Sequence, residues 1–140
     1  FKQGYFQPKN PNKYRGKHVP IYRSGWELAF MRLCDGHPNV ECWASESHSI
    51  PYRNPFTGKM TKYIPDFLLS YADKNGRKHI ELVEVKPSKQ AGITESRSRK
   101  DKAAVILNKA KWDAAQEWCK RRGIKFRIVT ENEIYHKPQK

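Results

Sequence analysis

Two carboxylates interrupt apolar segments of this chain, in Ile64-Pro65-Asp66-Phe67-Leu68 and in Val83-Glu84-Val85-Lys86. Burying a carboxylate is costly unless it is paired or coordinates a metal ion, so acids in apolar strands point to a specific use. Side chains alternate between the two faces of a strand, which puts Glu84 and Lys86 on one face. The same alternation puts Glu81 on the opposite face, where we expect it to be solvated or paired with another group.

The spacing of these motifs predicts a hairpin. Residues 61–71 and 78–85 are predicted as strands, with Asp66 inside the first, and the turn between them is Asp73-Lys74-Asn75-Gly76. If the strands pair in antiparallel fashion, the Asp66 carboxylate comes near Glu84, and the Lys86 ammonium joins both. Two carboxylates suit Mg²⁺, and a lysine can orient a water or offset charge on a phosphate. The alternative is a structural ion pair in which Lys86 satisfies the two acids.

The flanking segments alternate helix and strand patterns. A helix is predicted over about 24–34, because Ser24 and Glu27 form the S-x-x-E pattern of a capping box. Strands are predicted at 40–44, 49–52 and 125–130, a long helix over about 99–122 and a short one at 131–135, with a polar loop from residue 87. The order α-β-β-β-α-β predicts one α/β domain with a mixed sheet flanked by helices.

Charge narrows the class of partner. The 140 residues contain 28 Lys and Arg against 14 Asp and Glu, a formal net charge of +14. Such an excess favours a polyanion, and nucleic acid is the commonest one. No stretch approaches the roughly 20 apolar residues of a membrane span, so a membrane protein is excluded. The three cysteines leave one unpaired under any intramolecular pairing, which favours reduced thiols inside a cell.

Residues 1–23 are predicted to form an extended arm. They contain six Lys and Arg, no Asp or Glu, and three prolines that disfavour a helix. Aromatic side chains are interleaved with the basic ones, which suits contact with the backbone and bases of nucleic acid. An arm laid across its own domain, with the aromatics as anchors, accounts for the same composition equally well.

The motifs together resemble those of the PD-(D/E)xK nuclease superfamily, whose core is also α-β-β-β-α-β. With Tyr22-Arg23-Ser24-Gly25-Trp26-Glu27 they are similar to two branches, the TnsA transposon endonucleases and, more closely, the head-completion nucleases of T-even-like tailed phages. The resemblance runs from about residue 8 to residue 135. It implies a restriction-endonuclease-like αβββαβ fold, a single nuclease domain at 24–136 and a tail at 137–140.

The resemblance also implies roles for individual residues. Asp66, Glu84 and the Val85 carbonyl would bind Mg²⁺, for which Mn²⁺ would substitute, and Lys86 would act on the attacking water. Glu27 matches an acid that reaches the metal directly or through a water, a role that competes with its place in the capping box. The catalytic set is thus Glu27, Asp66, Glu84 and Lys86. Basic residues of the following segment are candidates for DNA contact: Lys89, Arg97, Arg99, Lys100 and Lys102.

The function expected from the resemblance is Mg²⁺-dependent hydrolysis of DNA phosphodiesters, in phage head completion and DNA packaging before the head joins the tail. Expected partners are DNA and, beyond it, head or portal proteins. We expect the protein in the host cytoplasm or with the virion, and not secreted. The alternative is a non-catalytic DNA-binding virion or assembly protein that keeps the nuclease-like fold.

Overall fold

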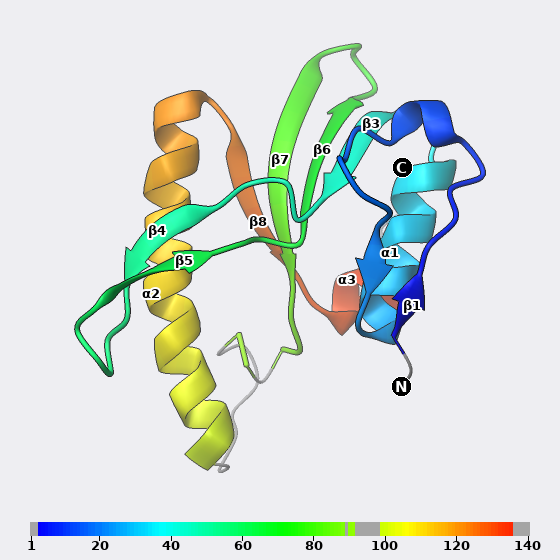
Figure 1. Cartoon of the computed structure of the whole chain (residues 1–140). Coiled ribbons are helices and arrows are strands. Elements are labelled where there is room, and N and C mark those ends of the chain that lie inside the picture. The colour runs from blue at the N-terminus through cyan, green and yellow to red at the C-terminus, as the bar shows by residue number, and fades with distance from the viewer. Residues whose placement is uncertain (1–2, 89, 92–98, 136–140) are drawn as a thin grey trace.

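The computed structural model describes residues 3–88, 90–91 and 99–135 (Figure 1). Its elements in chain order are β1 (Gly4–Tyr5), the 3-10 helix η1 (Pro11–Lys13), β2 (Ile21–Tyr22), α1 (Gly25–Gly36), β3 (Val40–Ser45), β4 (Ile50–Arg53), β5 (Met60–Tyr63), β6 (Phe67–Ala72), β7 (Lys78–Val85), α2 (Arg99–Arg122), β8 (Lys125–Val129) and α3 (Glu131–Tyr135). Within these residues no helix combines the length and the apolar composition that crossing a membrane requires.

Four strands form the central sheet in the order β3-β6-β7-β8. The pairs β3–β6 and β6–β7 are antiparallel, whereas β8 lies parallel to β7. A parallel neighbour needs a crossover connection, and α2 supplies it between β7 and β8. The mixed sheet and the order of helices and strands predicted from the sequence are confirmed.

The sheet separates two apolar layers. On one face α1 packs through Phe30, Met31 and Cys34 against Phe67 and Val83. The other face meets α2, whose Trp112, Ala115 and Cys119 pack with Leu82. Figure 1 shows the two helices on opposite sides of the strands. Alternation along β7 thus sends odd-numbered residues towards α1 and even-numbered residues, Glu84 among them, towards α2.

The prediction of one continuous strand over 61–71 is wrong, because this segment forms two strands in different sheets. β5 ends at Tyr63 and pairs with β4 in a separate two-stranded sheet, and β6 begins at Phe67 in the central sheet. Pro65, which is buried between them, has no N–H to donate to a ladder. Asp66 therefore lies immediately before β6 and not within a strand.

The N-terminal segment lies across its own domain. Phe6 is buried in the core on the α1 side, and Tyr14 meets the Trp43 ring edge-on with centroids 4.7 Å apart. The backbone N–H groups of Lys9 and Asn10 donate to the buried carboxylate of Asp35, at 2.9 and 3.0 Å. Residues 3–23 therefore lie across their own domain, and their contact with nucleic acid stays a prediction.

Candidate active site

Asp66 and Glu84 meet at the end of the central sheet. Phe67 pairs with Val83 in the β6–β7 ladder, so Asp66 and Glu84 are the next residues outward on the two chains. The Val85 N–H donates to Asp66 Oδ2 at 2.8 Å, and the Tyr63 hydroxyl donates to Glu84 Oε1 at 2.9 Å. These two bonds hold the carboxyls of adjacent chain segments at one place, as the sequence predicted.

Lys86 joins this pair from the residue after β7. Its Nζ lies 3.6 Å from Glu84 Oε2, and its side chain is 30% exposed against 7% for Glu84. The Lys86 N–H donates to the Val129 carbonyl at 3.0 Å, which continues the β7–β8 pairing by one bond. The ammonium is therefore paired on one side and accessible to solvent on the other.

The positive charge near the two carboxyls does not offset the effect of their burial on the pKa. Burial, and then the neighbouring Glu84, raise the pKa of Asp66 well above its usual range. Burial also raises the pKa of Glu84, although Lys86 and the Tyr63 hydroxyl act in the opposite direction. A carboxyl pair that resists full ionisation gains from an added cation, because the cation favours the charged form of both acids.

Tyr63 and Lys111 belong to this site and were missed by the sequence analysis. Lys111 comes from α2, and its Nζ lies 5.7 Å from the centroid of the Tyr63 ring. Burial, and then Lys86, lower the pKa of Lys111, while Glu84 and Asp66 oppose that shift. A signal was present in the sequence: a lysine four residues after Leu107, on the apolar face of an amphipathic helix.

Glu27 lies within electrostatic reach of the pair and also serves the start of α1. The Ser24 hydroxyl accepts from the Glu27 N–H at 3.1 Å, which confirms the predicted N-cap. Glu27 Oε1 accepts from the Arg23 N–H at 2.9 Å, one residue before the cap position of a standard capping box. Burial raises the pKa of Glu27, and the charge of Lys86 acts in the opposite direction. The negative charge of Glu27 in turn raises the pKa of Asp66.

Glu46 is a second acid near Glu27 that the sequence analysis did not single out. Its backbone φ of 49° is in the left-handed region, which is uncommon for a non-glycine residue. The Glu46 N–H donates to the Asp66 carbonyl at 2.9 Å, and its carboxylate pairs with Arg23. These contacts fix the backbone of Asp66 and place a salt bridge beside Glu27.

The donor set fits a hard cation that keeps part of its water shell. Over residues 3–88, 90–91 and 99–135, no three His, Cys, Asp or Glu side chains gather closely enough to hold an ion by themselves. Asp66 and Glu84 do converge, with the Val85 backbone beside them. Two carboxylates with waters and phosphate oxygens are a common way for proteins to hold Mg²⁺, so these residues are compatible with it.

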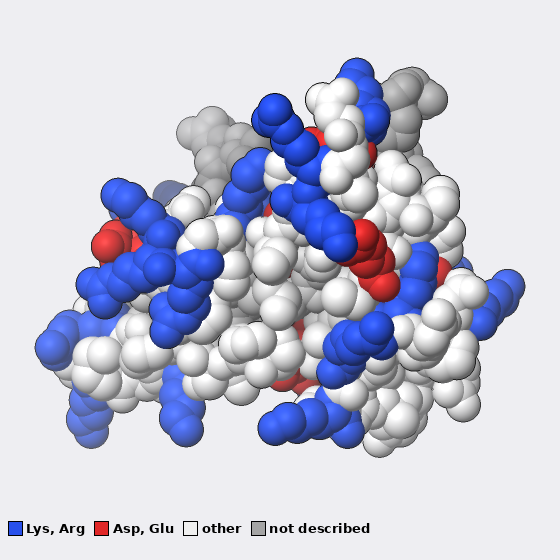
Figure 2. Space-filling view, turned by 90° about the horizontal axis from the view of Figure 1, so that it is seen from above, with Lys and Arg blue, Asp and Glu red and all other residues white. Residues whose placement is uncertain are grey.

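The predicted DNA-contact residues fall in two groups. Arg99, Lys100 and Lys102 lie in the first turn of α2, and all three are exposed. Lys89 and Arg97 lie outside the described residues. Figure 2 shows that Lys and Arg project all around one end of the molecule and that Asp and Glu form only small areas there. The positive charge is therefore not confined to the loop after residue 87.

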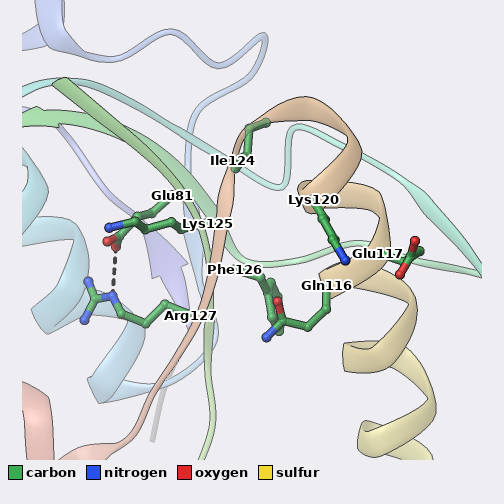
Figure 3. Close-up of a pocket in the computed structure, with 8 residues that line it drawn as sticks. All are labelled: Glu81, Gln116, Glu117, Lys120, Ile124, Lys125, Phe126 and Arg127. Carbon is green, nitrogen blue, oxygen red and sulfur yellow. Dashed lines mark hydrogen bonds and ion pairs between the residues drawn. The ribbon is translucent and has the colours of Figure 1, made fainter.

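A pocket of about 600 Å³ lies away from this site, between α2 and β8. Gln116 and Lys120 of α2 and Phe126 of β8 line it (Figure 3). Glu81 borders it too, but its carboxylate turns to Arg127 at 2.8 Å, and Tyr71 donates to it at 2.7 Å. Glu81 is thus paired elsewhere, as predicted, and the pocket shares no residue with the Asp66–Glu84 pair.

The fold and the paired acids are those of a restriction-endonuclease-like protein. The family model described as the TnsA-like endonuclease N-terminal domain matches residues 37–131, and the chain belongs to that family. The chain is also similar to the head completion nuclease of Enterobacteria phage T4. The two sequences are 36% identical, and the match covers 92% of this chain and 91% of the phage protein. The family match contains Asp66, Glu84 and Lys86, and it begins after Glu27.

Proposed function

We propose that this protein is a Mg²⁺-dependent DNA endonuclease that acts in the completion of a phage head. The observation that carries the proposal is the convergence of Asp66, Glu84 and Lys86 at one end of the sheet in a chain of an endonuclease family. The name of the phage T4 relative supports the biological step, and the net charge of +14 supports a polyanionic substrate.

In this proposal Asp66, Glu84 and the Val85 carbonyl oxygen hold the ion, with Glu27 acting directly or through a water. Mg²⁺, or Mn²⁺ in its place, would supply charge stabilisation at a phosphate oxygen and activate a bound water. Head or portal proteins are the further partners proposed, in the host cytoplasm or on the virion.

The chain's own residues account for the rest of the chemistry. Lys86 orients the attacking water and offsets the negative charge that grows on the phosphate. The Val85 N–H keeps Asp66 aimed at the site, and Tyr63 does the same for Glu84. The water oxygen bonds to phosphorus while the bond from phosphorus to the 3′ oxygen breaks. The products are a 5′-phosphate and a 3′-hydroxyl.

The test is nicking of supercoiled plasmid by the purified protein. We expect nicking with Mg²⁺ or Mn²⁺ and none with EDTA. Asp66→Ala and Lys86→Ala should each lower the rate about a hundredfold or more, since the first removes a ligand of the ion and the second removes the positive charge beside the reacting phosphate. Lys109→Ala is the matched control, because Lys109 is an exposed lysine in a surface pair with Asp113 and should leave the rate unchanged.

Calorimetric titration with Mn²⁺ gives a readout that does not depend on cleavage. Wild type should bind the ion, whereas Asp66→Ala should bind it weakly or not at all. Equal nicking by Lys86→Ala and wild type would refute the assignment of the site.

A specific observation also favours the non-catalytic alternative. Lys86 and Tyr63 already satisfy the Glu84 carboxylate, as they would in a structural ion pair. A DNA-binding assembly protein would bind DNA without nicking it and would show no heat with Mn²⁺. The same two experiments therefore separate the two functions.

A further inference from the structure

We propose that the β4–β5 hairpin, residues 50–63, is an arm that binds the DNA backbone next to the cleavage site and places Phe56 in a groove. The inference rests on the proposed function in that DNA is the substrate. It concerns a surface that is separate from the carboxylates and from the basic residues of α2.

The charge of the hairpin is of one sign. Residues 50–63 contain Arg53, Lys59 and Lys62 and no Asp or Glu. All three cations are exposed, and none of them forms an ion pair with a residue that the structure describes. Cations that are not neutralised within the protein are available to replace the counterions of a phosphate backbone.

The strand register sorts the hairpin into two faces. Ile50 and Tyr63 are opposite each other, both are buried, and they pack with Trp112 of α2. Lys62 pairs with Pro51, one position further along the hairpin, and Arg53 pairs with Met60, three positions further along. Side chains alternate between the two faces, so both cations lie on the face opposite Ile50 and Tyr63. The apolar face therefore fastens the hairpin to α2, and the basic face is left to solvent.

The tip of the hairpin is closed by hydrogen bonds and carries an exposed ring. Asn54 Oδ1 accepts from the N–H groups of Phe56 and Thr57, at 2.8 and 3.2 Å. Gly58, at φ 74°, supplies the left-handed residue of the turn, and its carbonyl accepts from Arg53 at 2.7 Å. Phe56 remains 58% exposed on this hydrogen-bonded turn. An apolar side chain between cations is the arrangement by which proteins wedge into a DNA groove.

The hairpin is joined directly to the catalytic residues. β5 ends at Tyr63, whose hydroxyl donates to Glu84, and Asp66 follows three residues later. Figure 1 shows the hairpin crossing α2, with its tip projecting beyond the helix. Lys62 precedes Tyr63 in β5 and lies four residues before Asp66, so DNA bound to the basic face at this end of the hairpin would lie beside the segment that leads into the acids, which argues for nucleic acid as the occupant of this face.

The test measures binding of a fluorescent linear duplex by anisotropy in EDTA, over a range of salt. Lys59→Ala/Lys62→Ala should weaken binding, and the slope of log affinity against log salt should fall in magnitude by about 1.8 if each lysine contacts one phosphate. Phe56→Ala should weaken binding about fivefold or more and leave the slope unchanged, since a groove contact releases no counterion.

The control is Lys74→Ala/Arg77→Ala, which removes two exposed cations from the β6–β7 turn. That hairpin lies at the opposite end of the sheet from the acids, so this variant should bind almost as tightly as wild type. Equal affinities and slopes for the two double variants would overturn the inference. Binding is measured without metal, so it does not depend on cleavage. A wild type that binds DNA but does not nick it would refute the proposed activity, and the comparison of the hairpin variants would still test this inference.

Discussion

At Asp66 and Glu84, folding and chemistry make opposite demands. Because both side chains are buried, the folded state is more stable when the two carboxyls are neutral. The proposed reaction, in contrast, needs two ionised carboxylates beside a lysine. Burial raises the pKa of both acids, and each is held by a donated hydrogen bond, from Val85 and Tyr63 respectively. An active site of this kind costs stability when no cation is bound.

The raised pKa of Asp66 sets the sign of a pH dependence. A carboxyl whose pKa is higher in the folded state than in the unfolded chain stabilises the fold at low pH, and that stability is lost as pH rises through the folded-state pKa. In EDTA, Asp66→Asn should therefore melt at a higher temperature than wild type at pH 8. The difference should shrink as the pH falls towards about 3.9, the ordinary value for an aspartic acid.

Thermal denaturation at several pH values checks this expectation. Asp113→Asn is the control, because Asp113 is an exposed acid on α2 whose replacement should change little. A melting temperature for Asp66→Asn below that of wild type at pH 8 would mean that the ionised carboxylate stabilises the fold. That result would contradict a raised pKa for Asp66.

At the scale of elements, the first turn of α1 contains both the helix cap at Ser24 and the acid Glu27 that lies near the candidate site. Ser24 caps the helix through the Glu27 N–H, and the Glu27 carboxylate bonds to Arg23 while it senses Asp66 and Lys86. The cap and the acid come from the same four residues, so the sequence could not separate them. In the structure the Ser24 hydroxyl provides the cap, whereas the Glu27 carboxylate both accepts from the Arg23 N–H at the helix start and raises the pKa of Asp66.

Two variants of this turn should therefore behave differently. Ser24→Ala should cost about 1 kcal/mol of stability and leave the nicking rate per folded molecule unchanged. Glu27→Gln keeps an oxygen that can accept from Arg23 and removes a carboxyl whose pKa is raised by burial, so it should not lower the melting temperature, yet it should lower nicking if the carboxylate serves the metal. Chemical denaturation and plasmid nicking measure the two effects, and full activity in Glu27→Gln would restrict Glu27 to the helix end.

At the scale of the whole molecule, the N-terminal segment is joined to the domain through Asp35. Asp35 is 4% exposed, and its carboxylate accepts from two backbone N–H groups, those of Lys9 and Asn10. Asn10 also donates from its side chain to the Asp35 carbonyl at 2.9 Å. The segment is thus part of the fold, although Arg15 and Lys17 remain exposed on its surface.

Asp35→Ala should release this segment. Two backbone N–H groups would lose their charged acceptor, which predicts a loss of up to about 3 kcal/mol of stability for each hydrogen bond. Limited proteolysis should then cleave within residues 3–23 faster than in wild type. Glu117→Ala is the control, since Glu117 is exposed in a surface pair with Arg121. Equal cleavage of Asp35→Ala and wild type would show that the aromatic anchors alone hold the segment.

Much of the architecture was predictable because its signals are local. The strand expected at 78–85 is β7, the helix at about 99–122 is α2 and the short helix at 131–135 is α3, since alternation, helical periodicity and a glycine after the helix act over a few residues. The helix expected at 24–34 runs on to Gly36. Apolar periodicity is less reliable for single side chains, because Ile106, an apolar residue next to the partly buried Leu107 of α2, is 51% exposed.

Residue types and their spacing along the chain were therefore enough to predict a mixed α/β sheet and the approach of Asp66, Glu84 and Lys86 to one another, since pleat and helical repeat are properties of neighbouring residues. The position of Lys111 beside Tyr63, the anchoring of the first residues at Asp35 and the departure of β4–β5 from the main sheet depended on the folded chain. These features are contacts between segments that are distant in sequence. Which face of a helix meets which strand is settled by packing of the whole chain, and no local pattern encodes it.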